Sequence, residues 1–184
     1  MYVVVALGLF AVGAWVAYQA FDHVQVRVET WINPWDDPDN TGFQIIQSWF
    51  AFGTGGFAGT GLGLGNPDKI PNAATDFVFS AIGEELGLVG TLGVLLMFIL
   101  LIGTAFRVAV DAERPFAKLF AAGLATTIAL QSFLILGGVT RLIPLTGITL
   151  PFVSYGGSSL VANFVILAFL LRISDDTARE RSDP

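Results

Sequence analysis

The stretch LGLVGTLGVLLMFILLIGTAF, residues 86–106, contains no charged residue and decides the fold class. A helix that crosses the hydrocarbon core of a bilayer needs about 20 mainly apolar residues, and this stretch supplies them. Further uncharged runs occupy residues 1–21, 119–140 and 142–171. The chain is therefore predicted to be an all-α integral membrane protein with about four transmembrane helices.

The composition of the whole chain supports a membrane location. Of the 184 residues, 54% are apolar and 13% are charged, whereas a soluble domain carries about a quarter charged residues. The net charge of −6 argues against a nucleic-acid partner, which would require basic patches. The absence of cysteine excludes disulfides and thiolate sites. Because Met1 leads directly into an apolar run without a basic stretch, we expect a segment of a longer protein rather than a signal peptide.

The charge pattern sets the expected boundaries of the spans and loops. Spans are predicted at 2–20, 84–106, 118–138 and 158–172, with connections at 21–82, 107–117 and 139–157 and a charged, frayed tail at 173–184. The short connection and the tail share one side and hold most of the basic residues, namely Arg107, Arg114, Lys118, Arg172, Arg179 and Arg181. Basic residues near span ends mark the cytoplasmic face, so the connections at 21–82 and 139–157 are expected to be extracytoplasmic.

The long connection carries structure of its own. Residues 42–52, GFQIIQSWFAF, are too few to span and are predicted to form a short helix in the membrane interface. The following residues, 55–65, contain six glycines, a composition that permits tight bends and the close approach of a ligand. We therefore expect a large, structured extracytoplasmic loop.

Polar residues at the head of the second span are the first candidates for a site. Thr75 or Asp76 would cap the helix, or Asp76 would be a partly desolvated carboxylate that faces a lipid-borne substrate as a general base. Glu84 and Glu85 either complement the helix dipole or turn inward towards a site. Arg141 is the one cation of the second outer connection, and it either snorkels at the interface or binds phosphate bidentately.

Three stretches resemble one known family. TDFVFSAIGEELGLVG (75–90) and LIPLTGITLPFVSYGGSSL (142–160) are similar to signature segments of the SEDS family of bacterial membrane proteins, the RodA/FtsW/SpoVE group. The segment NPWDDPDNTGFQIIQSWFAFGTGGFAGTGLGLG (33–65) is similar to that family's large outer loop. Family members have about ten spans, so the resemblance implies the C-terminal part of a ten-span fold.

The resemblance also implies an activity. SEDS proteins polymerise lipid II into glycan strands for elongation or division, with a slight preference here for the RodA-like role. The resemblance points to Asp76 as the general base that takes the proton of the acceptor sugar's 4-hydroxyl, in a reaction that inverts the anomeric carbon of the donor. The leaving diphosphate would be neutralised by a divalent cation, Mg or Mn, or by Arg or Lys, with no organic cofactor. The implied partner is a class B penicillin-binding protein, and the implied location is the bacterial cytoplasmic (inner) membrane.

Residues 144–159, Gly147 among them, are expected to shape the outer cavity beside Asp76, and a set of residues from these stretches is predicted to bind substrate. The members of this set are Thr75, Glu84, Glu85, Arg141, Thr146, Ser154, Tyr155, Gly156, Gly157, Ser158 and Ser159. The chain departs from the family where Asn72 and Ala74 replace a common Glu and His, and where Ile135 stands at a frequent Asn. These departures indicate a divergent branch and do not touch Asp76.

Two other functions stay open at the level of sequence. Pro144, Pro151 and the glycine-rich loop would break helices, as in transporters. The first alternative is therefore a flippase or transporter that moves lipid II across the membrane without catalysing a reaction. The second alternative is a non-catalytic membrane scaffold for a transpeptidase. Because the predicted spans carry almost no charge outside Glu84 and Glu85, chemistry at the membrane surface is favoured over a transmembrane path.

Overall fold

The computed structural model describes residues 1–182, and over that range the ordered elements are helices only. Four helices are long and apolar enough to cross a membrane: α1 (Tyr2–Ala20), α4 (Val78–Asp111), α5 (Pro115–Val139) and α6 (Gly157–Ser182). Two shorter helices, α2 (Asp22–Ile32) and α3 (Phe43–Gly55), and two 3₁₀ turns, η1 (Pro34–Asp36) and η2 (Pro67–Lys69), lie between α1 and α4. The predicted all-α membrane fold is confirmed.

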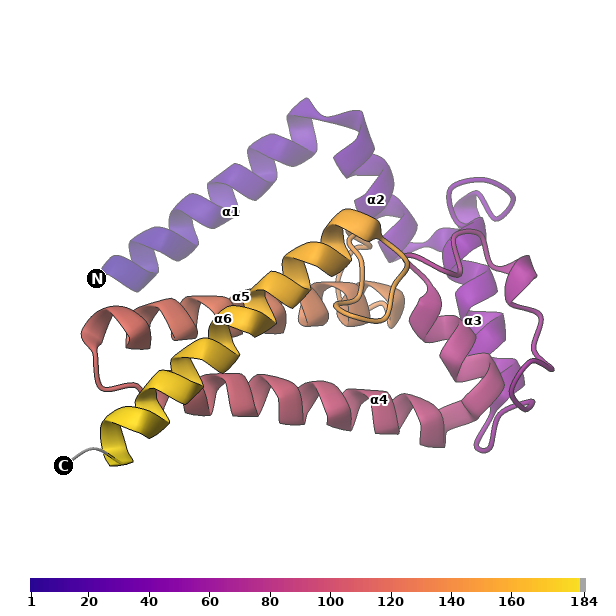
Figure 1. The fold of residues 1–184 in the computed structure, drawn as a ribbon. Helices are drawn as coiled ribbons and strands as arrows, with labels where there is room; N and C mark the ends of the chain where they lie inside the picture. Colours follow the sequence, from indigo (N-terminus) through magenta and orange to yellow (C-terminus); the bar gives the residue numbers. More distant parts are fainter. Residues whose placement is uncertain (183–184) are drawn as a thin grey trace.

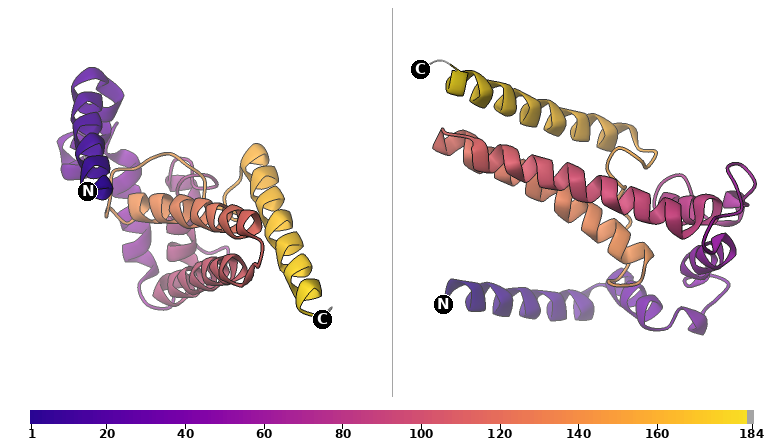
Figure 2. Two further views of the ribbon diagram at one scale, coloured as in Figure 1. Left: turned by 90° about the vertical axis from the view of Figure 1, so that its left-hand side faces the viewer. Right: turned by 90° about the horizontal axis from the view of Figure 1, so that it is seen from below.

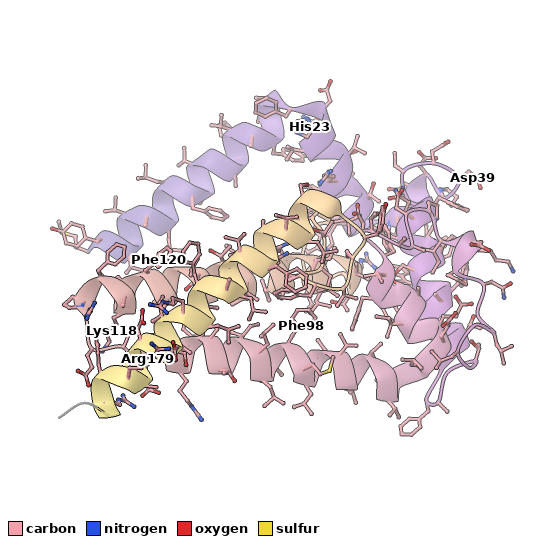
Figure 3. All side chains as sticks on the ribbon, in the orientation of Figure 1. His23, Asp39, Phe98, Lys118, Phe120 and Arg179 are labelled. Carbon is pink, nitrogen blue, oxygen red and sulfur yellow. The ribbon has the colours of Figure 1, made fainter. Side chains whose placement is uncertain are left out.

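The long helices alternate in direction, so the two kinds of connection lie at opposite ends of the molecule. Figure 1 shows the N-terminus and the end of α6 together at one end, and α2, α3 and the glycine-rich loop towards the other. In Figure 3, Lys118 and Arg179 lie at the first end and Asp39 at the second, here called the α3 end. This arrangement is the one that the alternation of spans predicts. Which end faces the cytoplasm is still a prediction from the basic residues.

Helices α4 and α5 form the tight centre of the bundle. Small side chains, Ala105 and Ala109 on α4 and Ala121 and Ala125 on α5, are buried between them and let the two backbones approach closely. Helix α1, in contrast, has no buried residue and stands apart from the other long helices in Figures 1 and 2. Its apolar surface is therefore available to lipid or to other protein segments.

Several boundaries differ from those predicted. Helix α4 begins at Val78 rather than 84, and helix α2 lies in a region that the hydropathy pattern assigned to loop. The tail expected to fray continues α6 as far as Ser182. Ion pairs one turn apart explain this extension, because Arg179 binds Asp175 at 2.9 Å and Arg172 binds Asp176 at 3.1 Å.

Helix α4 is broken at Gly87, which has φ 65° and ψ −161°. The glycine-rich loop lies against the break and satisfies the backbone groups that it frees. Thr60 N donates to Glu84 O at 2.9 Å, and Leu88 N donates to Gly56 O at 2.9 Å. The close approach expected of these glycines is thus made to the α4 backbone, and it holds the loop on the head of the helix.

Candidate functional site

Asp76, two residues before the start of α4, lies in a cavity of about 250 Å³. The start of α4 is at the α3 end of the molecule (Figure 1). The half-buried carboxylate shares this cavity with residues from α2, from the turn before α3, from α3 and from the α5–α6 connection. Helix α2 contributes Arg27 and Thr30, helix α3 contributes Gln44, and the connection between α5 and α6 contributes Leu145 and Gly147. Segments far apart in the sequence therefore meet around one carboxylate.

The turn before α4 fixes Asp76 without using its side chain. The N–H groups of Asp76 and Phe77 both donate to Asn72 O, at 3.1 and 3.3 Å, and the Phe77 side chain is fully buried. Helix α4 is preceded by Phe77 with no side-chain cap, and Thr75 Oγ1 donates instead to Asn72 O. The expectation that Thr75 or Asp76 caps the helix is wrong. The Asp76 carboxylate is consequently left to the cavity.

Asn72 also gives a physical reason for one departure from the family pattern. Its φ is 57°, in the left-handed region where asparagine is enriched over most other residues. An asparagine at this position therefore suits a turn that aims Asp76 into the cavity.

The connection between α5 and α6 supports this turn from the other side. Ser154 Oγ donates to Thr75 O and accepts from Leu150 N, and Tyr155 N donates to Ala74 O at 2.8 Å. Gln131 of α5 holds the same connection by donating to Thr149 O at 2.9 Å. The predicted meeting of the 75–90 and 142–160 stretches is thus seen directly as hydrogen bonds.

Replacing Ser154 with Ala should disturb the position of Asp76. The buried Leu150 N–H and Thr75 carbonyl would each lose a partner, so we expect a loss of about 1–3 kcal/mol in unfolding free energy. Thermal unfolding in detergent measures this loss. Ser174→Ala on the exposed far part of α6 is the matched control and should change nothing. Equal unfolding temperatures for the two variants would contradict this account.

The other predicted residues of the 142–160 stretch take different positions. Ser159 bonds to Thr149 at 2.6 Å and accepts from Asn163, so it joins α6 to the connection. The Tyr155 side chain and Ser158 are exposed, Gly156 directly precedes α6, and Gly157 is its first residue. Thr146 Oγ1 is buried and has no hydrogen-bond partner among the described residues. Contact of any of these residues with substrate stays a prediction.

Glu84 and Glu85 lie outside the Asp76 cavity. Glu84 is 5% exposed, and its Oε1 accepts from Asn66 N at 3.0 Å. It lines a separate cavity with Lys69 and Gln47. The Glu85 backbone carbonyl accepts from Gly61 N at 3.0 Å. Glu84 therefore does turn inward, but towards the glycine-rich loop.

Arg141 also lies away from Asp76 and fastens α2 to the α5–α6 connection. Its guanidinium donates to the carbonyls of Trp31 and Ile32, and its own carbonyl accepts from Trp31 Nε1 at 3.0 Å. It also stacks over the Trp49 ring, 4.9 Å from the ring centre. These contacts give Arg141 a structural task, and phosphate binding by it remains a prediction.

Sequence reasoning missed Arg27 and Gln44 as members of the site. The available signal was helical spacing, since Arg27 and Thr30 are three residues apart and share a face of α2. Helical spacing shows that the two residues share a face of α2, but it does not show that this face meets the Asp76 carboxylate.

An acidic turn completes the rim of the cavity. Asp37 accepts from Asn40 Nδ2 at 2.9 Å and from the backbone N–H and hydroxyl of Thr41 at 3.2 Å each. The hydrogen bond from Asn40, followed by that from the Thr41 backbone, lowers the pKa of Asp37 below its usual 3.8. The carboxylate therefore stays charged at neutral pH and holds Asn40 and Thr41 at the cavity edge.

Comparison with known proteins identifies the family. The sequence profile for FtsW, RodA and SpoVE, described as a cell cycle protein, matches residues 1–179. The chain belongs to this family. It is 55% identical over 178 residues to the peptidoglycan glycosyltransferase RodA of Mycobacterium tuberculosis H37Rv, which covers 97% of this chain and 38% of that protein. It is 47% identical to a probable peptidoglycan glycosyltransferase FtsW of Geobacter metallireducens, over 83% of this chain and 41% of that protein.

Solved structures agree with this membership. A chain of a peptidoglycan synthase complex, reported for its coordination of polymerization and crosslinking, matches 94% of this chain and 48% of its own length with a TM-score of 0.70 and 31% identity. A mutant of the rod shape determining protein RodA of Thermus thermophilus matches 56% of this chain and 35% of its own length, with a TM-score of 0.53 and 40% identity. The chain thus spans less than half the length of the relatives that it matches.

Proposed function

We propose that this member of the FtsW/RodA/SpoVE family supplies the base-bearing part of a peptidoglycan glycosyltransferase that polymerises lipid II. The proposal rests on the Asp76 carboxylate, which is half-buried, does not cap α4 and lines a partly polar cavity. Its relatives in the family carry the name peptidoglycan glycosyltransferase, which supports the reaction class.

A single carboxylate is enough for this chemistry. The acceptor 4-hydroxyl oxygen forms a bond to the donor's anomeric carbon while the bond from that carbon to the diphosphate oxygen breaks. Asp76 takes the hydroxyl proton, and the diphosphate leaves with the bonding electron pair. A diphosphate is stable as an anion, so no second carboxyl is needed to protonate it, unlike in glycoside hydrolases. Attack opposite the leaving group inverts the α-linked donor to a β-1,4 product.

The residues described here do not by themselves offer a binding set for Mg or Mn. Asp76 is the sole carboxylate among the described residues that line the cavity, and no group of three or more His, Cys, Asp or Glu is placed for a metal within residues 1–182. Divalent cations prefer several oxygen ligands.

The same proposal gives the protein a location and partners. A bacterial inner membrane with the α3 end outside would present Asp76 to lipid II after the lipid has reached the outer leaflet. The basic residues at the opposite end support this orientation. A class B penicillin-binding protein is the proposed partner, and the solved synthase complex that couples polymerization to crosslinking supports it.

The break in α4 is the one feature that favours a flippase instead. Broken helices of transporters leave backbone groups free to bind ions or substrate. Here the carbonyls of Glu84 and Glu85 accept from Thr60 N and Gly61 N, and the N–H groups of Leu88 and Val89 are paired with the same loop. The break is therefore closed by the protein itself, which supports surface chemistry over transport.

Purified protein and lipid II decide between these functions. The product of the natural reading frame is reconstituted in vesicles and is expected to convert lipid II to glycan strands. Gel analysis of the labelled product detects those strands. Movement of lipid II across the vesicle membrane without glycan formation would show a flippase instead. A scaffold would show neither reaction and would bind a transpeptidase.

A further inference from the structure

Arg27 occupies the Asp76 cavity from the side of α2. Its Nη1 donates to Leu145 O at 3.0 Å, which anchors the guanidinium against the α5–α6 connection. A Cβ built at Gly147 would lie 3.5 Å from Arg27 Nη2 and 3.6 Å from Asp76 Oδ2. Arg27 and Asp76 therefore both border the part of the cavity next to Gly147, which carries no side chain.

The two charges face this space without neutralising each other. No ion pair within 4.0 Å joins Arg27 to Asp76 or to any other described carboxylate. A guanidinium has five N–H donors, and the bond to Leu145 O uses one of them. Arg27 thus keeps donors for a ligand, whereas the donors of Arg141 are directed to the carbonyls of Trp31 and Ile32.

The fold holds Arg27 in this position. The contacts of Arg141 with Trp31 and Ile32 tie the end of α2 to the start of the α5–α6 connection. Arg27 lies just over one helical turn before Trp31, opposite Leu145 and Gly147 of the same connection. Gly147 has φ +70°, a conformation that favours glycine, so the backbone itself disfavours a side chain at this point of the cavity.

We propose that Arg27 is the anion-binding residue of this cavity and takes the diphosphate of a prenyl-linked sugar donor, with Gly147 providing the room. This inference rests on the proposed function and assigns to this chain's arginine the charge neutralisation that a metal would otherwise supply. Planar guanidinium binds phosphate oxygens bidentately, and its bonds strengthen as the leaving diphosphate gains charge. The acceptor hydroxyl then lies towards Asp76, across the same gap.

Equilibrium binding tests the proposal without requiring turnover. The probes are inorganic pyrophosphate and farnesyl diphosphate, titrated in detergent with EDTA into the product of the natural reading frame. We expect both probes to bind, the prenyl form more tightly, and Arg27→Gln to weaken both by at least about tenfold. Arg27→Lys should fall between, because it keeps the charge but loses the bidentate geometry.

Two further variants serve as controls. Lys69→Gln removes an exposed cation that lines a different cavity and should leave both affinities unchanged. Asp76→Asn removes the facing negative charge and should keep or tighten binding of pyrophosphate. Unchanged affinity in Arg27→Gln, or an equal loss in Lys69→Gln, would overturn the proposal. Binding of the inorganic probe alone would overturn its lipid-linked part.

Kinetics separate this inference from the proposed function. If lipid II is polymerised, Arg27→Gln should lower kcat as well as raise KM, because the diphosphate charge grows in the transition state. A normal kcat in Arg27→Gln would contradict the role. If no polymerisation occurs but Arg27→Gln still abolishes diphosphate binding, the proposed function fails while the anion site stands.

Discussion

Asp76→Asn is expected to lower the rate of lipid II polymerisation by about 10³-fold, because the amide cannot accept the acceptor's proton. The substitution keeps the shape of the side chain. The turn around it is held by the backbone N–H groups of Asp76 and Phe77 and by Ser154, none of which needs the carboxylate. The glycan product formed from labelled lipid II in detergent measures the effect.

The fold should survive this substitution. We expect the unfolding temperature of Asp76→Asn to match that of the parent, so the loss of rate cannot be assigned to misfolding. Asp68→Asn, an exposed aspartate in the same outer segment, is the matched control and should retain full polymerisation. If Asp76→Asn polymerised at the parent's rate, the carboxylate would not be the base.

Gly59→Ala is expected to have a large effect on stability. A Cβ at Gly59 would lie 2.1 Å from the Glu85 carbonyl oxygen, a backbone atom that cannot turn aside. The glycine-rich loop would have to leave the break in α4 and uncover backbone groups there. We expect a loss of more than about 3 kcal/mol in unfolding free energy, seen as a fall in unfolding temperature in detergent.

Gly63→Ala is the control that separates the effect of the close contact with Glu85 from the cost of alanine at a positive φ. Both glycines have a positive φ, +82° at Gly59 and +71° at Gly63, but a Cβ at Gly63 would meet no atom within 4 Å. This control should therefore lose only about 1 kcal/mol, the cost of a left-handed conformation. Equal losses in the two variants would show that the loop does not press against α4 as described.

The spans, and Asp76 as a candidate residue, were accessible to sequence reasoning because their signals are local. A run of apolar residues long enough to cross a bilayer predicts α1 and α5 almost to their ends. The stretch around Asp76 resembles a family signature within a few residues. Helix α6 was shortened in the prediction, because charged residues that pair along a helix look in sequence like a disordered tail.

The composition of the cavity was not accessible in the same way. Arg27, Gln44, Asp76 and Gly147 meet because α2, α3 and the α5–α6 connection line one cavity, and Arg141 ties α2 to that connection. The family-like stretches predicted that Asp76 and Gly147 share a cavity, whereas the spacing of Arg27 and Gln44 does not signal this site. The sequence likewise identified the glycines of the outer loop as close-approach positions but not the partner, which is the backbone of α4.

We propose that Asp76 opens, on the outer side of the membrane, to a cavity that a prenyl-linked sugar can enter. Because these 184 residues contain no cysteine, Asp76→Cys supplies one labelling position in this part of the protein. The measurement is labelling by a membrane-impermeant maleimide added outside intact spheroplasts, with and without lipid II. We expect the maleimide to label Asp76→Cys from outside, and we expect lipid II to suppress that labelling. Labelling only after the cytoplasmic side is exposed, or labelling that lipid II does not change, would contradict it.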